Sequence, residues 1–483
     1  MNRKLGLSTL VISVLFTSCT VGPKYTRPNV PAAPAYGEQP PVSFQESAEW
    51  KAAQPSDGSI RGNWWEIFNE PDLSALEVQV AAANPTVRAA EASFRQARAS
   101  VRIQRTGLFP TLSVDPAISS NHLSANSPTG ALTARGATFA NFSLPFDLSY
   151  EADLWGRIRR SIAAAREQYQ ASAADLENVK LALQSELAIY YFEARSLDAQ
   201  RELLDNNIVA FRRALELTQN RFNGGLASRA EVAQAETQLH QTEAQRIDVD
   251  QARAQYNHAI AVLVGKNPED YQLPLAPLKR VPPVIPTGLP SQLLERRPDI
   301  AIAERQLAAA NEQIGIAKAA FYPRLVITAT GGLQSGSIVN WFTWPSRLWA
   351  VGPELSQTVL DFGRRRAQVE LTEAAYDEYV NRYRESALTA FREVEDNLAA
   401  LRILEQEAAK QHDATTSAEN SVELAVNRYK GGIVTYLEVI TAQTIALTNQ
   451  RTEVDLMRRR MDASVLLVKA LGGGWDTSKL PQS

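Results

Sequence analysis

The chain has 483 residues, enough for two or three ordinary domains or for one duplicated domain. Its 50 Lys and Arg residues nearly balance its 53 Asp and Glu residues, so the charge gives no indication of a nucleic-acid partner. No apolar run reaches the roughly 18 to 20 residues of a membrane-spanning helix, so a membrane crossing would have to use strands of a closed barrel.

The N-terminus is typical of an export signal. A basic start at residues 2–4 precedes an apolar stretch at 5–16 that is too short to span a bilayer. Small residues then lead to Cys19, the only cysteine, in an arrangement that resembles a bacterial lipoprotein box. We predict a signal peptide over residues 1–18 and acylation of Cys19, which would anchor the protein in lipid. The alternative is an ordinary cleaved signal with an incidental cysteine.

Two proline-rich segments divide the rest of the chain. Residues 19–62 predict an extended, lipid-anchored tether that is not a packed element, and residues 268–290 predict a connector between two halves. The halves are expected over 63–267, with a helix, two strands and a long helical hairpin, and over 291–472. A tail, 473–483, follows.

The two halves repeat one another. The matching segments, in order, are 84–112 with 297–325, 155–157 with 362–364, 220–226 with 427–433, and 264–265 with 471–472. A tandem repeat of this length predicts two copies of one structural unit that continue the same architecture.

Each half carries two strand-like segments before its hairpin. The clearest, residues 140–150, has an apolar residue at every second position. Its repeat partner carries Trp349, Val351, Leu355 and Val359 on the matching face, and shorter segments lie near 111–119 and 324–330. Segments of about ten residues with this alternation fit transmembrane barrel strands. A water-soluble sheet with one buried face is the alternative.

Long proline-free stretches follow the strands and predict long helices. Apolar residues recur at steps of three and four from Leu176 to Leu197, the stripe of a helix that packs against another helix. One arm of some 65 residues would reach on the order of 100 Å.

Each proline-free stretch is interrupted by one pair of glycines, Gly224-Gly225 in the first half and Gly431-Gly432 in the second. Each pair is expected to end a helix with a left-handed cap. The next helix begins at once, because residues 228–231 (SRAE) and 435–438 (TYLE) both predict capping boxes. Each half thus predicts a helical hairpin.

The strand count predicts an assembly. Four strands cannot close a barrel, since bacterial barrels begin near eight strands. An open sheet in lipid would leave backbone groups unpaired at several kcal/mol each. We therefore expect either that the sheet lies outside the membrane or that several copies share one barrel. The long helices carry apolar stripes that must also pack against other helices, which favours several copies sharing one barrel.

At this point several motifs together resemble the TolC-like outer-membrane efflux factors, in the lipoprotein branch of the OprM and NodT type. The motifs are CTVGPKY at 19–25, WWEIF at 64–68, DLWGR at 153–157, RRPDI at 296–300 and ALGGGW at 470–475. The resemblance covers nearly the whole mature chain. It implies an α+β membrane protein: a homotrimer with a twelve-stranded β-barrel in the bacterial outer membrane, a twelve-helix periplasmic α-barrel and an equatorial belt. It also implies a periplasmic adaptor protein, an inner-membrane pump of the resistance-nodulation-division type, and drugs, solvents or metal ions as exported compounds.

In that family the glycine-marked turns form the periplasmic tip where the adaptor docks. The resemblance transfers this role to Gly224, Gly225 and Leu226 and to Gly431, Gly432 and Ile433. Helix capping alone is the alternative. The family also narrows its tunnel with acidic side chains just after the second turn. Glu438 matches one such position and Thr441 stands at the next, so a double acidic ring is not expected; capping alone is again the alternative for Glu438.

Arginines open both long helices: Arg157, Arg159 and Arg160, and Arg364, Arg365 and Arg366. Cations at a helix N-terminus oppose its dipole by a few tenths of a kcal/mol each. We hypothesise that they contact outer-membrane lipid phosphates at the periplasmic face of the barrel, with plain solubility as the alternative.

Catalytic and metal-binding signatures are missing from the sequence. The four histidines stand singly, and there is no phosphate loop, nucleophile elbow or dinucleotide fingerprint. We predict a passive duct, neither an enzyme nor a cofactor protein. The alternatives are an outer-membrane duct for secreted polypeptides and a peripheral helical lipoprotein scaffold that does not span the membrane.

Overall fold

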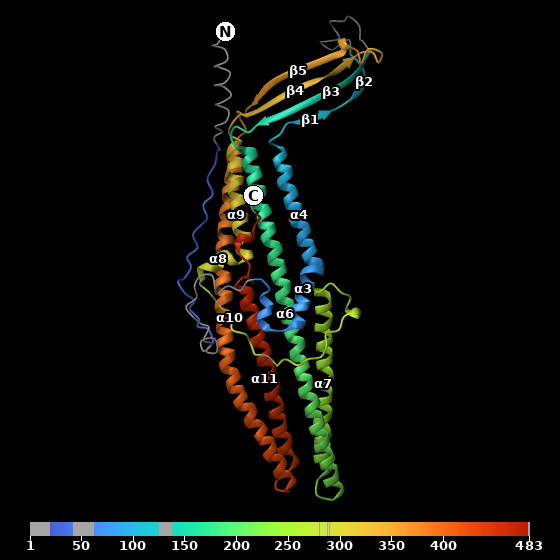
Figure 1. Ribbon diagram of the computed structural model, residues 1–483, viewed down its shortest axis with the longest axis vertical. Coiled ribbons are helices and arrows are strands. Elements are labelled where there is room, and N and C mark those ends of the chain that lie inside the picture. Colours follow the sequence, from blue (N-terminus) through green and yellow to red (C-terminus); the bar gives the residue numbers. More distant parts are fainter. Residues whose placement is uncertain are drawn as a thin grey trace.

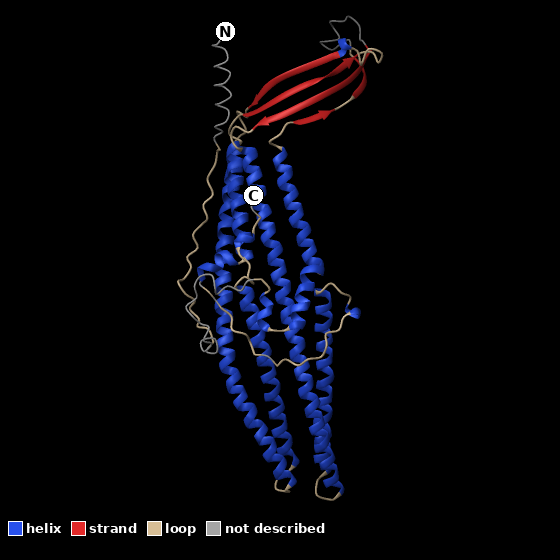
Figure 2. Cartoon of the chain, viewed as in Figure 1, coloured by secondary structure: helices blue, strands red, loops and turns tan. Residues whose placement is uncertain are grey.

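A computed structural model describes residues 20–41, 62–124, 138–279, 281–286, 288 and 290–481. Long helices form a rod with a sheet at one end and two tight turns at the other (Figures 1 and 2). Cys19 and the expected signal peptide lie outside the described residues, so lipidation stays a prediction from the sequence.

The helices of the described chain, with short 3-10 helices labelled η, are η1 (Trp64–Phe68), α3 (Pro71–Ala83), α4 (Pro85–Thr106), α6 (Arg157–Asn223), α7 (Arg229–Leu263), η2 (Pro268–Asp270), η3 (Pro290–Gln292), α8 (Leu293–Arg296), α9 (Pro298–Ala319), η4 (Trp344–Ser346), α10 (Arg364–Lys430), α11 (Tyr436–Ala470) and η5 (Thr477–Lys479). The strands are β1 (Thr111–Val114), β2 (Ala117–His122), β3 (Thr138–Ala152), β4 (Arg324–Ser335) and β5 (Arg347–Ser356).

The duplication predicted from the sequence is confirmed in the helices. The pairs α4 and α9 have 22 residues each, α6 and α10 have 67 each, and α7 and α11 have 35 each. Equivalent positions are 213 residues apart up to the first strand of each half, as Pro85 and Pro298 show, and 207 apart in the hairpins, as Arg157 and Arg364 show. We call such positions repeat-equivalent.

One hydrogen bond between helices occurs in both repeats, although a different side chain donates it in each. The Asn84 side chain caps α4 and donates through Nδ2 to the carbonyl of Leu263 at 2.8 Å. At the repeat-equivalent place Arg297 donates through Nη1 to the carbonyl of Ala470 at 3.0 Å. The geometry of the repeat therefore persists where the side chains have changed.

The sheet is antiparallel, in the order β1-β3-β4-β5, and β2 also pairs with β3. β1 and β2 continue one another along β3 in the same register and are separated only at Asp115 and Pro116, where proline lacks a backbone donor. The four predicted strand segments are therefore present, one of them interrupted.

The far end of β5 differs from the expectation. Val359, expected on the strand face, lies outside β5, which ends at Ser356. The reason is the length of the neighbouring strand, since β4 begins at Arg324, directly opposite Ser356. Beyond that point β5 has no strand partner among the residues that the structure describes.

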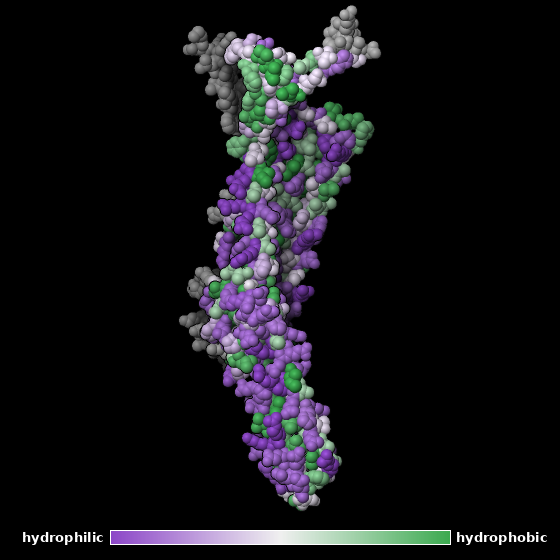
Figure 3. Space-filling model, turned by 90° about the vertical axis from the view of Figure 1, so that its right-hand side faces the viewer, coloured by the Kyte–Doolittle hydropathy of each residue, from purple (hydrophilic) through white to green (hydrophobic). Residues whose placement is uncertain are grey.

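One face of the sheet is apolar and exposed. Trp349, Val351 and Leu355 of β5 are exposed on it, and Figure 3 shows hydrophobic surface gathered on the sheet above a largely hydrophilic rod. None of the helices in the described part of the chain carries the apolar 18-residue stretch needed to cross a bilayer.

The main core lies around α3, halfway along the rod (Figure 1). Phe68 packs against Trp64 and Phe192 with ring centroids 6.3 Å and 5.2 Å away. The connector crosses here, and the amide of Leu278 donates to the carbonyl of Arg195 at 3.0 Å. Burial in α3 raises the pKa of the Glu77 carboxyl well above its usual range.

The described part of the proline-rich tether, residues 20–41, is extended, but the prediction that it does not pack is wrong there. Tyr25 donates to Glu304 of α9 at 2.8 Å, and the amides of Gly37 and Glu38 donate to Glu395 of α10 at 2.7 and 2.8 Å. Prolines remove regular structure from this segment without removing its other amides, which find partners on the helices. Its start lies beside the sheet, because the Val21 amide donates to the carbonyl of Trp155 at 3.2 Å.

Candidate functional site

The end of the rod away from the sheet consists of two turns that close the α6–α7 and α10–α11 hairpins. The second glycine of each turn, Gly225 or Gly432, has a φ of 74° or 73°. In both turns the amide after this glycine donates to a carbonyl five residues earlier: Leu226 to Arg221 at 2.8 Å, and Ile433 to Arg428 at 3.0 Å. These are the left-handed helix ends that the sequence predicts.

The turns are open to a partner. Leu226 and Ile433 are 72% and 71% exposed. A Cβ at Gly225 would meet no atom within 4 Å, and one at Gly432 would meet only the Arg221 guanidinium at 3.9 Å. Small residues beside an exposed aliphatic side chain allow another backbone to approach closely.

The predicted capping box at the start of α7 is present. Ser228 Oγ accepts a hydrogen bond from the Glu231 amide at 3.3 Å, and Glu231 Oε2 accepts one from the Ser228 amide at 3.0 Å. The other oxygen of Glu231 accepts from the Tyr436 amide, the first residue of α11, at 3.3 Å. One carboxylate therefore serves the start of two helices and joins the two hairpins.

The predicted capping box at the start of α11 is wrong. Thr435 occupies the cap position without a side-chain hydrogen bond. Glu438 instead accepts from Arg428 at 2.5 Å, with both side chains half-exposed. Glu231 of the first hairpin already accepts from the Tyr436 amide, and Arg428, across the same turn, binds Glu438. The local capping box therefore does not form.

Aromatic residues hold the two hairpins together just above the turns. The Arg221 guanidinium of α6 lies 4.6 Å from the ring centroid of Tyr429 of α10, whose carbonyl accepts from the same arginine at 3.1 Å. Tyr429 in turn packs on Tyr436 at 5.3 Å between centroids. Burial raises the pKa of the Tyr436 hydroxyl to about 12, so it stays neutral at physiological pH.

Sequence reasoning missed these contacts, although the repeat carried a signal. Arg221 and Glu231 are repeat-equivalent to Arg428 and Glu438, and so have the same identity in both hairpins. Their contacts Tyr429 and Tyr436 are repeat-equivalent to a phenylalanine and an arginine. The two tyrosines of the second hairpin therefore differ from their counterparts in the first hairpin. This difference in the sequence marks the positions where the two hairpins contact each other.

A groove of roughly 600 Å³ opens beside the pair of Arg428 and Glu438. Its apolar lining includes the exposed residues Leu437 and Ile445. Thr441 also lines it, one turn along α11 from Glu438, and its hydroxyl donates to the Leu437 carbonyl at 2.9 Å. The two candidate constriction residues therefore share one open face of the second hairpin.

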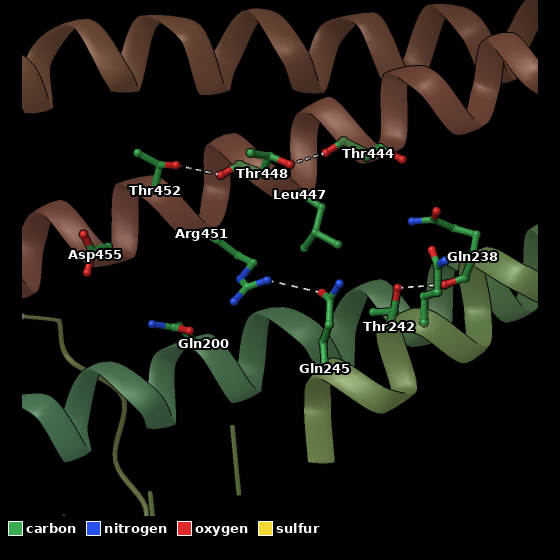
Figure 4. A pocket seen from close by; sticks show the side chains of 11 residues that line it. Gln200, Gln238, Thr242, Gln245, Thr444, Leu447, Thr448, Arg451, Thr452 and Asp455 are labelled. Atoms are coloured by element: carbon green, nitrogen blue, oxygen red, sulfur yellow. Dashed lines mark hydrogen bonds between the residues drawn. The ribbon is translucent and has the colours of Figure 1, made fainter. Parts of the chain in front are cut away.

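A second groove, of roughly 440 Å³, lies higher between α7 and α11 (Figure 4). Glutamine and threonine side chains dominate its wall, and Arg451 donates to Gln245 across it at 3.3 Å. Uncharged amides and hydroxyls both donate and accept hydrogen bonds. Such a wall can form hydrogen bonds with water and with polar solutes, and it does not select ligands of one charge.

The arginines that open the long helices are mostly paired. Arg157 binds Glu151, Arg159 binds Asp153, Arg160 binds Glu312, and Arg365 binds Asp361. Asp153 also accepts from the amides of Ile158 and Arg159, and Asp361 from those of Gly363 and Arg365. These carboxylates therefore offset the unfavourable charge at the helix starts. Arg364 and Arg366 are exposed and make no ion pair with another described residue.

Within the described residues, no three His, Cys, Asp or Glu side chains gather in a way that could hold a metal ion.

Comparisons with known proteins agree with this architecture. The family model "Outer membrane efflux protein" matches residues 76–266 and 289–473. The toluene efflux pump outer membrane protein TtgF of Pseudomonas putida is 31% identical over 471 residues, covering 97% of this chain and 96% of its own. Outer membrane protein OprJ of Pseudomonas aeruginosa is 30% identical over 478 residues, with 98% and 97% covered. The solved outer-membrane channel OprN is similar with a TM-score of 0.85 at 26% identity, over 95% of this chain and 100% of its own.

Proposed function

The chain belongs to the outer membrane efflux protein family, as an outer-membrane channel that extends into the periplasm, and from this premise we propose that three copies form one passive export duct. The duct would receive small toxic compounds from a periplasmic adaptor and an inner-membrane pump of the resistance-nodulation-division type. Organic solvents are the first compounds to test, because the relative TtgF is named for toluene efflux. The channel would contribute no catalysis, and the pump would supply the energy.

The observation that carries this proposal is a sheet, on top of two long hairpins, whose two outer edges have no strand partner in the described part of the chain. β1 and β5 are the outer strands of the sheet within the chain. Each repeat adds a 67-residue and a 35-residue helix below it. Only further copies can continue both the strand ladder and the helical wall. Family membership argues against a peripheral scaffold, and no contact in the described chain favours a polypeptide as the cargo.

A deletion strain tests the function. Removing the gene from its own host is expected to lower the tolerated concentration of organic solvents and hydrophobic drugs several-fold, and re-supplying it should restore tolerance. Restoration should fail in a strain whose cognate pump has been inactivated, since the duct moves nothing alone. Full tolerance without the gene, or restoration without the pump, would refute the proposal.

We assign adaptor docking to the tip residues Gly224, Gly225 and Leu226 and Gly431, Gly432 and Ile433. The open space around the glycines and the exposure of Leu226 and Ile433 support this role. Glu438, with Thr441 on the same face of α11, is the proposed tunnel constriction. This role is supported because Glu438 does not cap α11: its carboxylate accepts from Arg428 and from no described amide at a helix start.

The lipid role of the arginines is proposed for Arg364 and Arg366, which are exposed and have no ion-pair partner among the described residues. Each cation near an anionic lipid surface contributes about 1 kcal/mol. Replacing both with Gln is expected to weaken retention of phospholipid by the purified channel roughly thirtyfold, as measured by native mass spectrometry. The control replaces Arg157 and Arg159, whose carboxylate partners already neutralise them. Equal lipid retention in all three proteins would exclude the role.

A further inference from the structure

The turn that joins β4 to β5 leads into an exposed arginine at the end of the sheet away from the helices (Figure 1). Arg347 is the first residue of β5, and it makes no ion pair with another described residue. It is also the only charged residue between Arg324 and Glu354 in the sequence. The outer part of this strand pair therefore presents a positive charge and has no carboxylate of its own to offset it.

The strand register places Arg347 on the apolar face of the sheet. Arg347 lies opposite Leu333 of β4, and Leu333 lies opposite Leu144 of β3. Directly opposed residues share a face, as does every second residue of one strand, so Trp349 projects on the same side as Arg347. In an outer-membrane channel this apolar face is the one that contacts lipid.

An arginine on the lipid side of a barrel is tolerated near the membrane surface. The cost of the charge is largest at the midplane of the bilayer and falls to almost nothing at the interface. The ten residues of β5, tilted as barrel strands are, cover roughly 25 Å, the height of the apolar band of such barrels. Arg347, at the first position, therefore lies at one edge of this band. Since β5 runs toward α10 and the periplasm, this is the outer edge.

The turn before β5 holds the guanidinium over an aromatic ring. The η4 helix begins at Trp344, three residues before Arg347, and residues three apart in a 3-10 helix lie above one another. The Arg347 Cζ atom lies 3.9 Å from the Trp344 ring centroid. The hydroxyls of Thr343 and Ser346 fix the turn by donating to the Asn340 carbonyl at 2.7 and 2.6 Å. A guanidinium held over an indole keeps N–H groups free for an anion.

Aromatic side chains surround this cation and continue the apolar face. Trp344 and Phe342 are 75% and 69% exposed. Trp341 packs on Phe342 with ring centroids 4.9 Å apart and on Phe142 of β3 with centroids 5.5 Å apart. Phe142 shares the apolar face, because it lies two residues before Leu144 on the same strand. A ligand at this place would meet a cation beside apolar rings, which suits an anion that carries hydrocarbon chains.

We propose that Arg347, Trp344 and Phe342 form a binding site for lipopolysaccharide, with the guanidinium on a phosphate of the lipid A headgroup and the rings beside its acyl chains. The position of the site selects this occupant, since lipopolysaccharide replaces phospholipid in the outer leaflet of a bacterial outer membrane. Arginine suits the phosphate because its planar fork donates two parallel hydrogen bonds. The site is separate from Arg364 and Arg366, which follow the periplasmic end of β5.

The site belongs to the second repeat alone. The offset of 207 residues also holds for the second strand of each repeat, whose pairing register repeats. At this offset the sequence has Ala140 in place of Arg347 and Ala137 in place of Trp344. Each chain therefore carries one site of this kind, and a substitution at Arg347 removes the cation completely.

Binding of lipid A to the channel purified from outer membranes tests the site. Diphosphoryl lipid A is titrated into the detergent-solubilised protein, and its occupancy is measured by native mass spectrometry. Arg347→Gln is expected to weaken this binding at least roughly tenfold, because a charge-assisted hydrogen bond to phosphate is lost. Arg347→Lys keeps the charge without the fork and should bind with an affinity between those of Arg347→Gln and the wild type.

The matched control is Arg324→Gln, which removes another exposed arginine of the same sheet. Arg324 opens β4 at the periplasmic end, and the register places it on the face opposite to that of Arg347. This variant is expected to bind lipid A as tightly as the wild type. Trp344→Leu keeps an apolar side chain but removes the aromatic support of the guanidinium, and should weaken binding about threefold.

Each further outcome would overturn the assignment. Wild-type affinity in Arg347→Gln would show that the guanidinium does not hold the lipid, and equal loss in Arg324→Gln would mean that net charge attracts it without a built site. Equal affinity for dephosphorylated lipid A would exclude the phosphate contact. Phosphatidylglycerol that competes as well as lipid A would exclude lipopolysaccharide as the specific occupant. Solvent tolerance in the deletion strain tests the export function separately from all of these measurements.

Discussion

Gly432→Trp is expected to abolish efflux while the trimer stays assembled. A side chain at Gly432 meets only the Arg221 guanidinium, at 3.9 Å, so an indole would project into the open space where the adaptor is proposed to dock. The left-handed φ of 73° makes any side chain strained, at a cost of roughly 1–2 kcal/mol that a long helical rod tolerates. Solvent tolerance in the deletion strain measures efflux, and co-purification measures adaptor binding.

Gly432→Asn separates bulk from backbone strain, because asparagine adopts the left-handed conformation more readily than other residues. We expect this variant to keep most of its efflux and its adaptor. Normal tolerance with Gly432→Trp would show that the adaptor does not dock at this turn. Equal loss in both variants would mean that a distorted turn, and not a blocked surface, stops export.

The long hairpins could be predicted from the sequence because their signals are local. Prolines are missing from both stretches, apolar residues recur at helical steps, and only Gly224-Gly225 and Gly431-Gly432 interrupt each run. Every one of these features acts within a few residues of the chain. The structure confirms a helix of 67 residues before each turn and one of 35 after it.

The candidate site was less predictable because it depends on contacts between hairpins. Residues 228–231 and 435–438 carry the same capping signature, yet only Ser228 and Glu231 form the box. Whether Glu438 turns back to its own helix start or outward to Arg428 is decided by what lies across the turn, and no local pattern contains that information. The packed tether has the same origin, since its partners Glu304 and Glu395 are hundreds of residues away.

At the end of β5 the sequence prediction failed for a different reason, because the strand there depends on the assembly of several copies. The alternating pattern continues to Val359, and the sequence predicted a strand there. A single chain ends β5 at Ser356 because β4 offers no residue beyond Arg324. The prediction therefore fails for one copy for the same reason that the four strands cannot close alone.

Glu231→Ala is expected to raise the basal current of the reconstituted channel several-fold. Its carboxylate accepts from the amides of Ser228 and Tyr436 and so joins the two hairpins at the tip. Loss of a cap costs typically about 1 kcal/mol at each helix start. The looser tip should open more often with unchanged preference between cations and anions, because this carboxylate is engaged by backbone groups. Single-channel recording in planar bilayers gives both quantities, and an unchanged current would show that the bridge does not hold the tip closed.

Glu438→Ala is expected to change the ion selectivity, which Glu231→Ala leaves unchanged. The pair that Glu438 forms with Arg428 is half-exposed, and such pairs contribute at most about 1 kcal/mol, so its loss should leave the hairpins in place. If Glu438 narrows the tunnel, removing its charge lowers the preference for cations, which shifts the reversal potential, and Thr441→Asp on the same face strengthens that preference. A current and a reversal potential both equal to those of the wild type would exclude Glu438 from the constriction. Closure of the tip would then depend on Glu231 and the aromatic contacts between hairpins, which act through packing and not through a ring of charge.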